Sequence, residues 1–470
     1  MEKHQLPFLT VAALAHLVQT HEVSPVEVVE AYLKRIERLN PQLHAFLTVC
    51  PEDARRAART AEHEMAHGAY RGSLHGIPYA VKDQLSTRGI RTTAGSPFFA
   101  DVVPDDDATV IAKLHQAGAI LLGKLNMTEF GTTGFSHQFS TPCNPWDLAR
   151  YTGGSSSGSG AATAAGLCAT SLGEDTGGSI RFPAAWCGVV GLRPSWGRVS
   201  RYGLMPGVWS MDTLGPLARS VTDCALTLEA IAGHDPKDPY TWNVSVPPYT
   251  QGLDGTITGL RVGVVREQLD TDLVQPEVRA AVLCALDVLR DLGATVEDVS
   301  IPLAAHAGTI SGGLRVEAPR RYRTLLQSHL QEISHDNRIG YLTGALLPAQ
   351  AYYKAQQLRV LLRQQVLQAL AQVDVLVQPT AGLVAQPVEP DPLIDSKTKT
   401  NRLSWLLTTT YSLANVPALS LPCGFHTLQD GTALPIGLQI AGKPFAEVTV
   451  FKVANAYEQQ TPWHHQRPPL

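Results

Sequence analysis

Residues 171–188 read SLGEDTGGSIRFPAAWCG, and the arrangement expected of the whole chain can be built outward from them. The stretch begins with a β-like run, continues into a turn with two glycines, and has the pattern of a strand–turn–helix connection that ends at Gly188. Two consecutive glycines, Gly177 and Gly178, allow a tight bend in which successive backbone N–H groups point at one spot. At the end of such a turn, Ser179 could attack a carbonyl carbon while those N–H groups hold the oxyanion. A purely structural connection is the alternative.

The chain around this stretch alternates between β-like and helical patterns. Ser24 and Glu27 form a capping box ahead of a helical periodicity, so the first seventy residues are predicted to be helical. Further β-like runs lie at residues 76–84, 119–126, 260–265, 294–301, 374–380, 418–424 and 437–442, and helical ones at 108–118, 276–293 and 349–370. Strands separated by helices predict an α/β fold with a large mixed, mostly parallel central sheet covered by helices on both faces.

We expect a single αβα domain over residues 1–470. The polar segments at 233–259 and 385–400 are the weakest points in the pattern, but neither is long or biased enough to predict a domain boundary. The expected parts are an N-terminal helical segment (1–70), a core that carries the chemistry (71–220) and the remaining sheet and helices (221–470).

Composition narrows the class of protein. Apolar residues make up 44% of the chain, charged residues 17%, and the net charge is −4, which argues against a nucleic-acid-binding protein. The seven cysteines are dispersed without a CxxC pair, so neither a disulfide framework nor a structural zinc site is predicted. No apolar run is long enough to span a bilayer, and no signal segment is evident. We expect a cytoplasmic protein without a membrane partner.

Several short patterns suggest other chemistries. HEMAH at residues 63–67 matches the HExxH zinc pattern, but the third ligand of the metzincin pattern is missing, and a solvent-facing helix accommodates the same residues. GAILLGK at 118–124 has P-loop spacing, yet its interior is an apolar strand and Leu125 replaces the magnesium-binding Ser or Thr. SKTK at 396–399 lacks the companion β-lactamase motifs. None of these is preferred.

GSSSG at residues 154–158 fits the GxSxG nucleophile elbow, with Ser156 at its centre. An elbow requires a strand directly before the serine. The preceding residues carry Pro and Gly and are typical of a loop, so this interpretation is not favoured either.

Lys82 is the most informative charged residue. It follows the apolar run at residues 77–81, so its side chain is expected to enter the interior from a strand end. Burial disfavours the ammonium form, which would make a neutral amine available as a base. A structural ion pair with the neighbouring Asp83 is the alternative. Two serine-bearing glycine turns and a buried lysine together suggest a relay of hydroxyls that ends on an amine.

These motifs resemble those of the amidase signature enzymes, and the similarity covers essentially the whole chain. The motifs that carry it are HGIPYAVKD (75–83), GKLNMTEF (123–130), GGSSSGSGAATAAG (153–166), SLGEDTGGSIRFPAAWCGVVGLRPSWGRVSRYG (171–203) and PALSLPCGF with PIGLQIAGKPF (417–425 and 435–445). The resemblance implies the amidase signature fold and an amidohydrolase that acts on linear C–N bonds.

The resemblance also implies site residues. Ser179 would be the nucleophile, Ser155 the bridging serine next to a cis peptide, and Lys82 the base. The backbone N–H groups of Thr176, Gly177, Gly178 and Ser179 would form the oxyanion hole. Asp175 and Arg181 would brace the turn. No cofactor and no metal are implied.

Departures from the family pattern are informative about substrate. Ser157, Glu174 and Leu125 replace residues common in the family, without touching the triad. In the glutamine-hydrolysing member of the family that serves glutamyl-tRNA(Gln) amidotransferase, an Asp reads the glutamine amino group, and the corresponding position here is Trp405. This apolar residue weighs against glutamine. Met127, Trp209 and Trp405 are candidates for an apolar acyl or aryl pocket, with ordinary core positions as the alternative.

The sequence thus predicts an amidase that hydrolyses a carboxylic amide, or an anilide, carbamate or ester, to an acid plus ammonia or an amine through a Ser acyl-enzyme. The alternative is the glutamine-hydrolysing (A-type) component of an aminoacyl-tRNA amidotransferase. The expected partner is a small-molecule amide substrate, with no nucleic acid or membrane, and a homodimer is an open alternative for the assembly.

Overall fold

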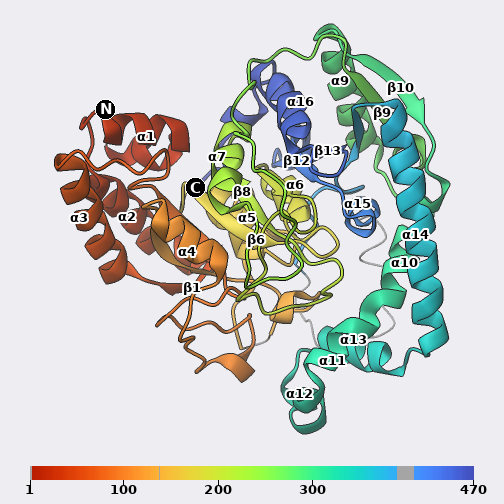
Figure 1. The fold of residues 1–470 in the computed structure, drawn as a ribbon, viewed down its shortest axis with the longest axis horizontal. Helices are drawn as coiled ribbons and strands as arrows, with labels where there is room; N and C mark the ends of the chain where they lie inside the picture. Colours follow the sequence, from red (N-terminus) through yellow and green to blue (C-terminus); the bar gives the residue numbers. More distant parts are fainter. Residues whose placement is uncertain (1–2, 137, 389–406) are drawn as a thin grey trace.

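An eleven-stranded sheet organises the molecule (Figure 1). The computed structural model describes residues 3–136, 138–388 and 407–470. The strands lie in the order β1 (Phe46–Val49), β3 (Ile120–Leu125), β2 (Pro78–Lys82), β6 (Thr170–Glu174), β8 (Leu214–Ala218), β7 (Val190–Arg193), β12 (Ala418–Thr427), β13 (Ala433–Gly442), β11 (Val375–Pro379), β9 (Arg261–Val265) and β10 (Thr295–Val299). A separate hairpin joins β4 (Cys143–Asn144) to β5 (Asp147–Tyr151).

The predicted α/β fold with a large mixed sheet is confirmed, but the sheet is less parallel than predicted. Four neighbouring pairs are parallel, namely β2 with β3 and β6, and β9 with β10 and β11. The other six are antiparallel. A buried antiparallel strand reads as the same continuous apolar run as a parallel one, so the sequence pattern did not separate the two.

Helices surround the sheet on both sides (Figure 1). They are α1 (Val11–Gln19), α2 (Pro25–Leu43), α3 (Pro51–Ala66), α4 (Thr109–Gln116), α5 (Ser157–Ala164), α6 (Arg181–Cys187), α7 (Val221–Ile231), α8 (Arg266–Leu269), α9 (Pro276–Asp291), α10 (Ala307–Gly313), α11 (Glu317–Arg321), α12 (Arg323–Ser328), α13 (His335–Leu346), α14 (Ala349–Gln372), α15 (Thr409–Ala414) and α16 (Glu447–Gln459). Helices α1 to α3 gather at one end of the molecule, while α14 runs along the opposite edge.

Local sequence signals set several helix ends. Ser24 caps α2: its hydroxyl accepts the Glu27 N–H at 3.1 Å, and the Glu27 carboxylate accepts the Ser24 N–H at 3.1 Å, so the predicted capping box is confirmed. Helices α5 and α6 follow the two Gly/Ser-rich turns and are buried along their whole length. Both turns therefore lie inside the molecule, against the carboxyl ends of β2 and β6.

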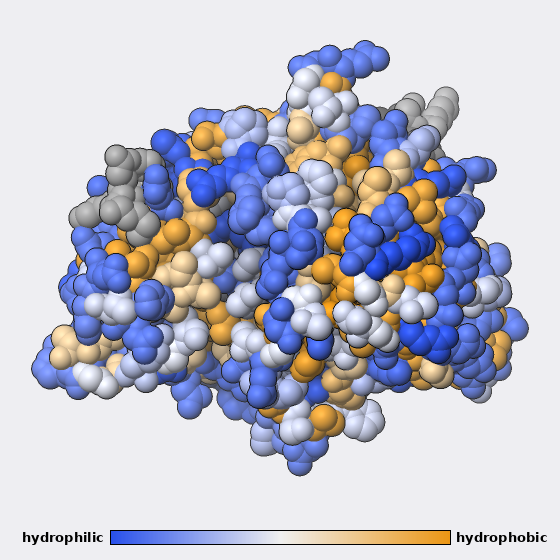
Figure 2. Space-filling view, turned by 90° about the horizontal axis from the view of Figure 1, so that it is seen from above, coloured by the Kyte–Doolittle hydropathy of each residue, from blue (hydrophilic) through white to orange (hydrophobic). Residues whose placement is uncertain are grey.

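The outer surface mixes hydrophilic and hydrophobic residues across the face shown in Figure 2. Within the ranges that the structure describes, no helix is both long and apolar enough to cross a membrane.

Candidate active site

Lys82 ends strand β2, and its side chain is fully buried. Its Nζ lies 2.6 Å from Ser155 Oγ, which is also buried. Burial lowers the pKa of Lys82, although the carboxyl group of Glu174, 3.1 Å from Nζ, opposes part of the shift. Asp83 pairs with Lys124 instead, at 3.5 Å. The structure therefore places Lys82 against Ser155 and not against its neighbour in sequence.

Ser155 lies in the turn before α5, and the peptide bond between Gly154 and Ser155 is cis, as the family resemblance implies. Its carbonyl oxygen accepts a hydrogen bond from the Thr128 N–H at 3.2 Å. Gly153 has φ +80°, and a Cβ at that position would lie 3.0 Å from backbone atoms of Pro183. The Gly/Ser-rich stretch is thus a packed turn, not a linker.

Ser156 holds two backbone segments together. Its hydroxyl lies 3.2 Å from the carbonyl oxygen of Glu174 and accepts the Glu174 N–H at 3.3 Å. Its own N–H donates to the carbonyl oxygen of Ser179 at 3.2 Å. Strand β5 ends at Tyr151, before the turn, so no strand leads directly into Ser156. The nucleophile-elbow interpretation is not supported, and Ser156 instead fastens the Ser155 turn to the Ser179 turn.

The turn between β6 and α6 presents unused backbone donors. Across the described ranges, the N–H groups of residues 176–179 donate no hydrogen bond within the chain. Gly178 has φ +140°, and a Cβ there would lie 2.8 Å from Thr408 Cβ, so only glycine fits. Thr408 Oγ1 donates to the carbonyl oxygen of Gly177 at 2.6 Å. Ser179 is half-buried at the end of this turn. The free N–H groups beside it are suited to bind an anion.

Asp175, the residue directly before the turn at 176–179, anchors that turn to the rest of the protein through two arginines. Arg181 on α6 makes two parallel hydrogen bonds to its carboxylate, at 3.0 and 2.9 Å, and Arg193 on β7 lies 3.5 Å from it and donates to its carbonyl oxygen. Burial raises the pKa of Asp175, but the two guanidinium groups outweigh it and hold the pKa at about 2. Arg181 also donates to Gln439 on β13 at 2.6 Å and to Ser412 on α15 at 2.7 Å. The bracing role expected of Asp175 and Arg181 agrees with these contacts.

Glu174 is a buried acid beside the base. Its Oε2 faces Lys82, and its Oε1 lies 2.8 Å from Thr176 Oγ1, which itself lies 2.7 Å from Asp212 Oδ1. Burial raises the pKa of Glu174. From the sequence we could note Glu174 only as a departure from the family pattern. Asp212 carried no motif at all, so its place beside Thr176 was not predicted.

Known proteins are similar to this chain in sequence and in fold. A family model described as Amidase matches residues 27–451. The chain belongs to the amidase family. The glutamyl-tRNA(Gln) amidotransferase A chain from Thermosynechococcus vestitus is 43% identical to this amidase, over 96% of this chain and 97% of its own length. The amidase signature resemblance is confirmed, and the chain is an amidohydrolase that acts on C–N bonds.

Two solved structures show how far the fold of this amidase is shared. One is described as a vestigial protein complex that reveals the evolutionary origins of an s-triazine catabolic enzyme. It has a TM-score of 0.89 at 33% identity and covers 96% of this chain and 98% of its own. The native peptide amidase from Stenotrophomonas maltophilia has a TM-score of 0.84 at 32% identity and covers 98% of both chains.

The predicted pocket residues of this amidase differ in their surroundings. Met127 is buried beside Gly95, directly before the Thr128 N–H that binds the Ser155 turn. Trp209 is 49% exposed and stacks on Tyr240 with ring centroids 4.9 Å apart. Trp405 lies outside the described residues. A role in substrate binding stays a prediction for all three.

The HEMAH residues, at the end of α3 and its C-cap His67, have other partners than a metal ion. The rings of His63 and His67 contact each other with centroids 4.2 Å apart, both facing solvent. Glu64 pairs with His75 at 3.0 Å and with Arg71. In the described part of the chain, no three His, Cys, Asp or Glu side chains gather into a group that could hold a metal ion.

The other sequence patterns are structural or fall outside the described ranges. The GAILLGK segment forms most of the buried strand β3. Lys124 donates to Leu85 O at 2.6 Å and to Thr92 Oγ1 at 2.7 Å, so the segment is not a phosphate-binding loop. The SKTK segment at 396–399 lies outside the described residues.

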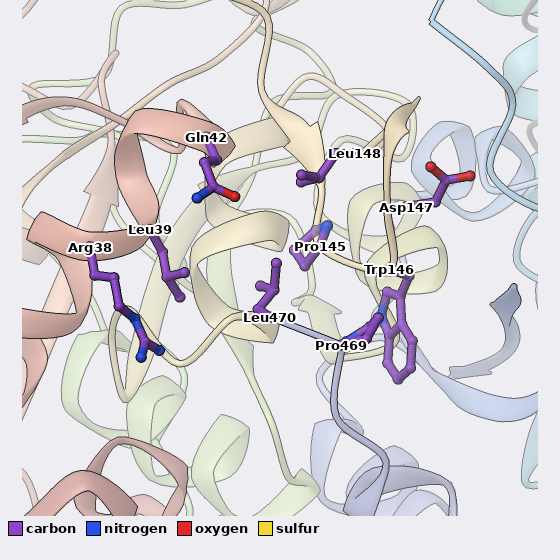
Figure 3. Close-up of a pocket in the computed structure, with 9 residues that line it drawn as sticks. All are labelled: Arg38, Leu39, Gln42, Pro145, Trp146, Asp147, Leu148, Pro469 and Leu470. Carbon is purple, nitrogen blue, oxygen red and sulfur yellow. The ribbon is translucent and has the colours of Figure 1, made fainter.

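A cavity of about 500 Å³ lies away from these catalytic candidates (Figure 3). Its walls come from α2, the β4–β5 hairpin and the C-terminal residues. They are formed by Arg38, Leu39, Gln42, Pro145, Trp146, Asp147, Leu148, Pro469 and Leu470. None of the predicted triad or oxyanion residues lines it.

Proposed function

We propose that this amidase hydrolyses a carboxylic amide through a Ser179 acyl-enzyme, with Ser155 as the relay and Lys82 as the base. The observation that carries the proposal is the 2.6 Å contact between Lys82 Nζ and Ser155 Oγ inside the protein. The hydrogen bond from Ser156 N–H to Ser179 O, at 3.2 Å, fastens the relay turn to the nucleophile turn.

In the proposed acylation step, Ser179 Oγ attacks the amide carbon as its proton passes to Ser155 Oγ and the Ser155 proton passes to Lys82 Nζ. The free N–H groups of residues 176–179 stabilise the oxyanion. When the C–N bond breaks, the proton returns through Ser155 to the leaving nitrogen, which departs as ammonia or an amine. Water then attacks the ester by the same route, which releases the acid and restores Ser179.

The names of the relatives bear on the substrate. Glutamyl-tRNA(Gln) amidotransferase A chains are 41–43% identical to this chain over nearly its full length. This supports a glutamine-hydrolysing component of a cytoplasmic multi-subunit amidotransferase better than it supports an anilide, carbamate or ester substrate. The apolar Trp405 at the position expected to read the glutamine amino group is the one sequence feature against glutamine. We therefore propose a primary carboxamide as the substrate class, with glutamine as the first to test.

The nucleophile is tested with the Ser179→Ala variant. We expect loss of turnover and loss of labelling by a fluorophosphonate probe, with circular dichroism to show that the fold is kept. Full activity in this variant would exclude Ser179 as the nucleophile.

The substrate is tested by measuring ammonia release from glutamine and from aliphatic primary amides, and aniline release from anilides, with the same preparation. Ammonia from glutamine, increased by proteins that co-purify with the chain from its own cell, would support the amidotransferase role. Turnover of simple amides by the isolated chain, with none of glutamine, would support an independent amidase.

A further inference from the structure

A buried hydrogen-bond chain leads from the proposed base to a second acid. Lys82 Nζ lies 3.1 Å from Glu174 Oε2, Glu174 Oε1 lies 2.8 Å from Thr176 Oγ1, and Thr176 Oγ1 lies 2.7 Å from Asp212 Oδ1. Lys82, Glu174 and Asp212 are fully buried, and Thr176 is half-buried. Because water does not reach these groups freely, each polar atom of this hydrogen-bond chain must find its partner among the hydrogens of the same four residues and their neighbours.

Thr176 has one hydroxyl hydrogen and lies between two carboxyl groups. Asp212 accepts the Gly207 N–H on Oδ2 at 2.8 Å and the Val208 N–H on Oδ1 at 3.0 Å, so both of its oxygen atoms act as hydrogen-bond acceptors. Thr176 therefore donates its hydrogen to Asp212. A hydrogen is still needed between Glu174 Oε1 and Thr176 Oγ1, since two oxygen atoms 2.8 Å apart repel without one. Only a protonated Glu174 can supply it.

The neighbours of Lys82 Nζ match a neutral amine. A neutral amine has two hydrogens and one lone pair. Two acceptors face it, Glu174 Oε2 at 3.1 Å and the Glu174 carbonyl oxygen at 3.4 Å, while the Ser155 hydroxyl at 2.6 Å can donate to the lone pair. Burial lowers the pKa of Lys82 and raises that of Glu174, so it favours the same two neutral forms.

We propose that Glu174 is a positioning residue that holds a proton in the resting enzyme and so keeps Lys82 available as a neutral base. This inference rests on the proposed role of Lys82. The proton stays on Glu174 Oε1 during turnover, while Lys82 accepts the Ser155 proton and returns it to the leaving nitrogen. Two further acidic groups face the pair: Asp212, which accepts from Thr176 and from two backbone N–H groups, and Asp175, whose charge is balanced by its two arginines.

The first test measures the proton directly. Infrared difference spectra between wild type and Glu174→Gln, recorded near pH 7 without substrate, are expected to show a carboxylic acid C=O band that shifts in D₂O. Glu458→Gln is the matched control: Glu458 on α16 is a buried acid outside the site, with its pKa raised to about 8 by burial. That variant should leave the Glu174 band in place. Glu174→Ser, which removes the carboxyl group, is a second reference if Glu174→Gln does not fold.

The second test uses the pH dependence of kcat/KM. Its acid limb is the pH range in which kcat/KM rises as the base loses its proton. The amide introduced by Glu174→Gln would reproduce the hydrogen pattern of the acid, with its NH₂ directed to Thr176 and its carbonyl oxygen to Lys82. We therefore expect the acid limb of Glu174→Gln to lie at the wild-type pH, because the amide stands in for a neutral acid. If Glu174 is instead an ionised partner of an ammonium, its removal should move the acid limb down by about one pH unit or more.

Absence of the acid band, or that shift of the acid limb, would overturn the role of Glu174. The infrared result needs no turnover, so it remains informative even if Lys82→Met stays active and the proposed function fails.

Discussion

Thr408 donates a 2.6 Å hydrogen bond from Oγ1 to the carbonyl oxygen of Gly177, and so joins the turn after β6 to the segment before α15. The same side chain fills the space in which a Cβ at Gly178 would lie. The C-terminal half of the chain therefore holds the backbone N–H groups next to Ser179 in place.

The first prediction concerns Gly178→Ala. The added Cβ would displace Thr408 and requires φ +140°, so the N–H array should be lost. We expect kcat to fall by about 10²–10³, the loss typical of one oxyanion donor. Gly72→Ala is the control, because Gly72 has φ +111° with no atom within 4 Å of the added Cβ. Equal kinetics for both variants would contradict the assignment.

The second prediction concerns Asp175. Its folded-state pKa of about 2 lies below the ordinary value of 3.8, so the stabilisation it provides is complete above about pH 4 and is lost as the pH falls through 2. The difference between these two pKa values corresponds to about 2 kcal/mol of the free energy of unfolding. Urea unfolding at several pH values measures it.

Asp175→Asn leaves two buried arginines with a neutral partner, and should lower the free energy of unfolding by about 3–5 kcal/mol. Asp270→Asn is its control, since Asp270 forms an exposed pair with Arg266 at 3.3 Å that contributes about 1 kcal/mol or less. If Asp175→Asn lowers the free energy of unfolding no more than Asp270→Asn does, Asp175 does not brace the Ser179 turn.

The third prediction concerns the pH dependence of turnover. Because burial lowers the pKa of Lys82, the neutral amine forms as the pH rises, and kcat/KM should increase from acid toward alkaline pH. Lys82→Met should reduce kcat/KM by about 10²–10⁴ and remove this acid limb. A wild-type profile that is flat between about pH 5 and 9 would count against Lys82 as the base.

The fourth prediction separates the two buried lysines. Lys124→Met removes the partner of the buried Asp83 carboxyl and should lower the free energy of unfolding by about 3 kcal/mol. The variant should keep the acid limb of kcat/KM, because Lys124 contacts Leu85 and Thr92 and not the triad candidates. Loss of the acid limb in Lys124→Met would show that the division of roles is wrong.

The sequence by itself determined those features that depend on local pattern. The capping box at Ser24 and the alternation of strands and helices follow from side chains a few residues apart. The sequence motifs also predicted Lys82, Ser155 and Ser179 as site residues, and Lys82 contacts Ser155 in the structure. The sequence left open whether Lys82 pairs with its neighbour Asp83, and only the structure shows that Asp83 pairs with Lys124.

Tertiary structure alone decided the order and direction of the strands and the partners of the buried charges. The sheet was predicted to be mostly parallel, but six of its strand pairs are antiparallel. The prediction was wrong because a strand buried on both faces has the same apolar sequence pattern in either direction. Asp212 and Thr408 reach the Ser179 turn from segments outside the 171–203 motif, and no local motif marks either residue. Their contacts form only once the sheet is assembled, so the environment of the base could not be predicted from sequence.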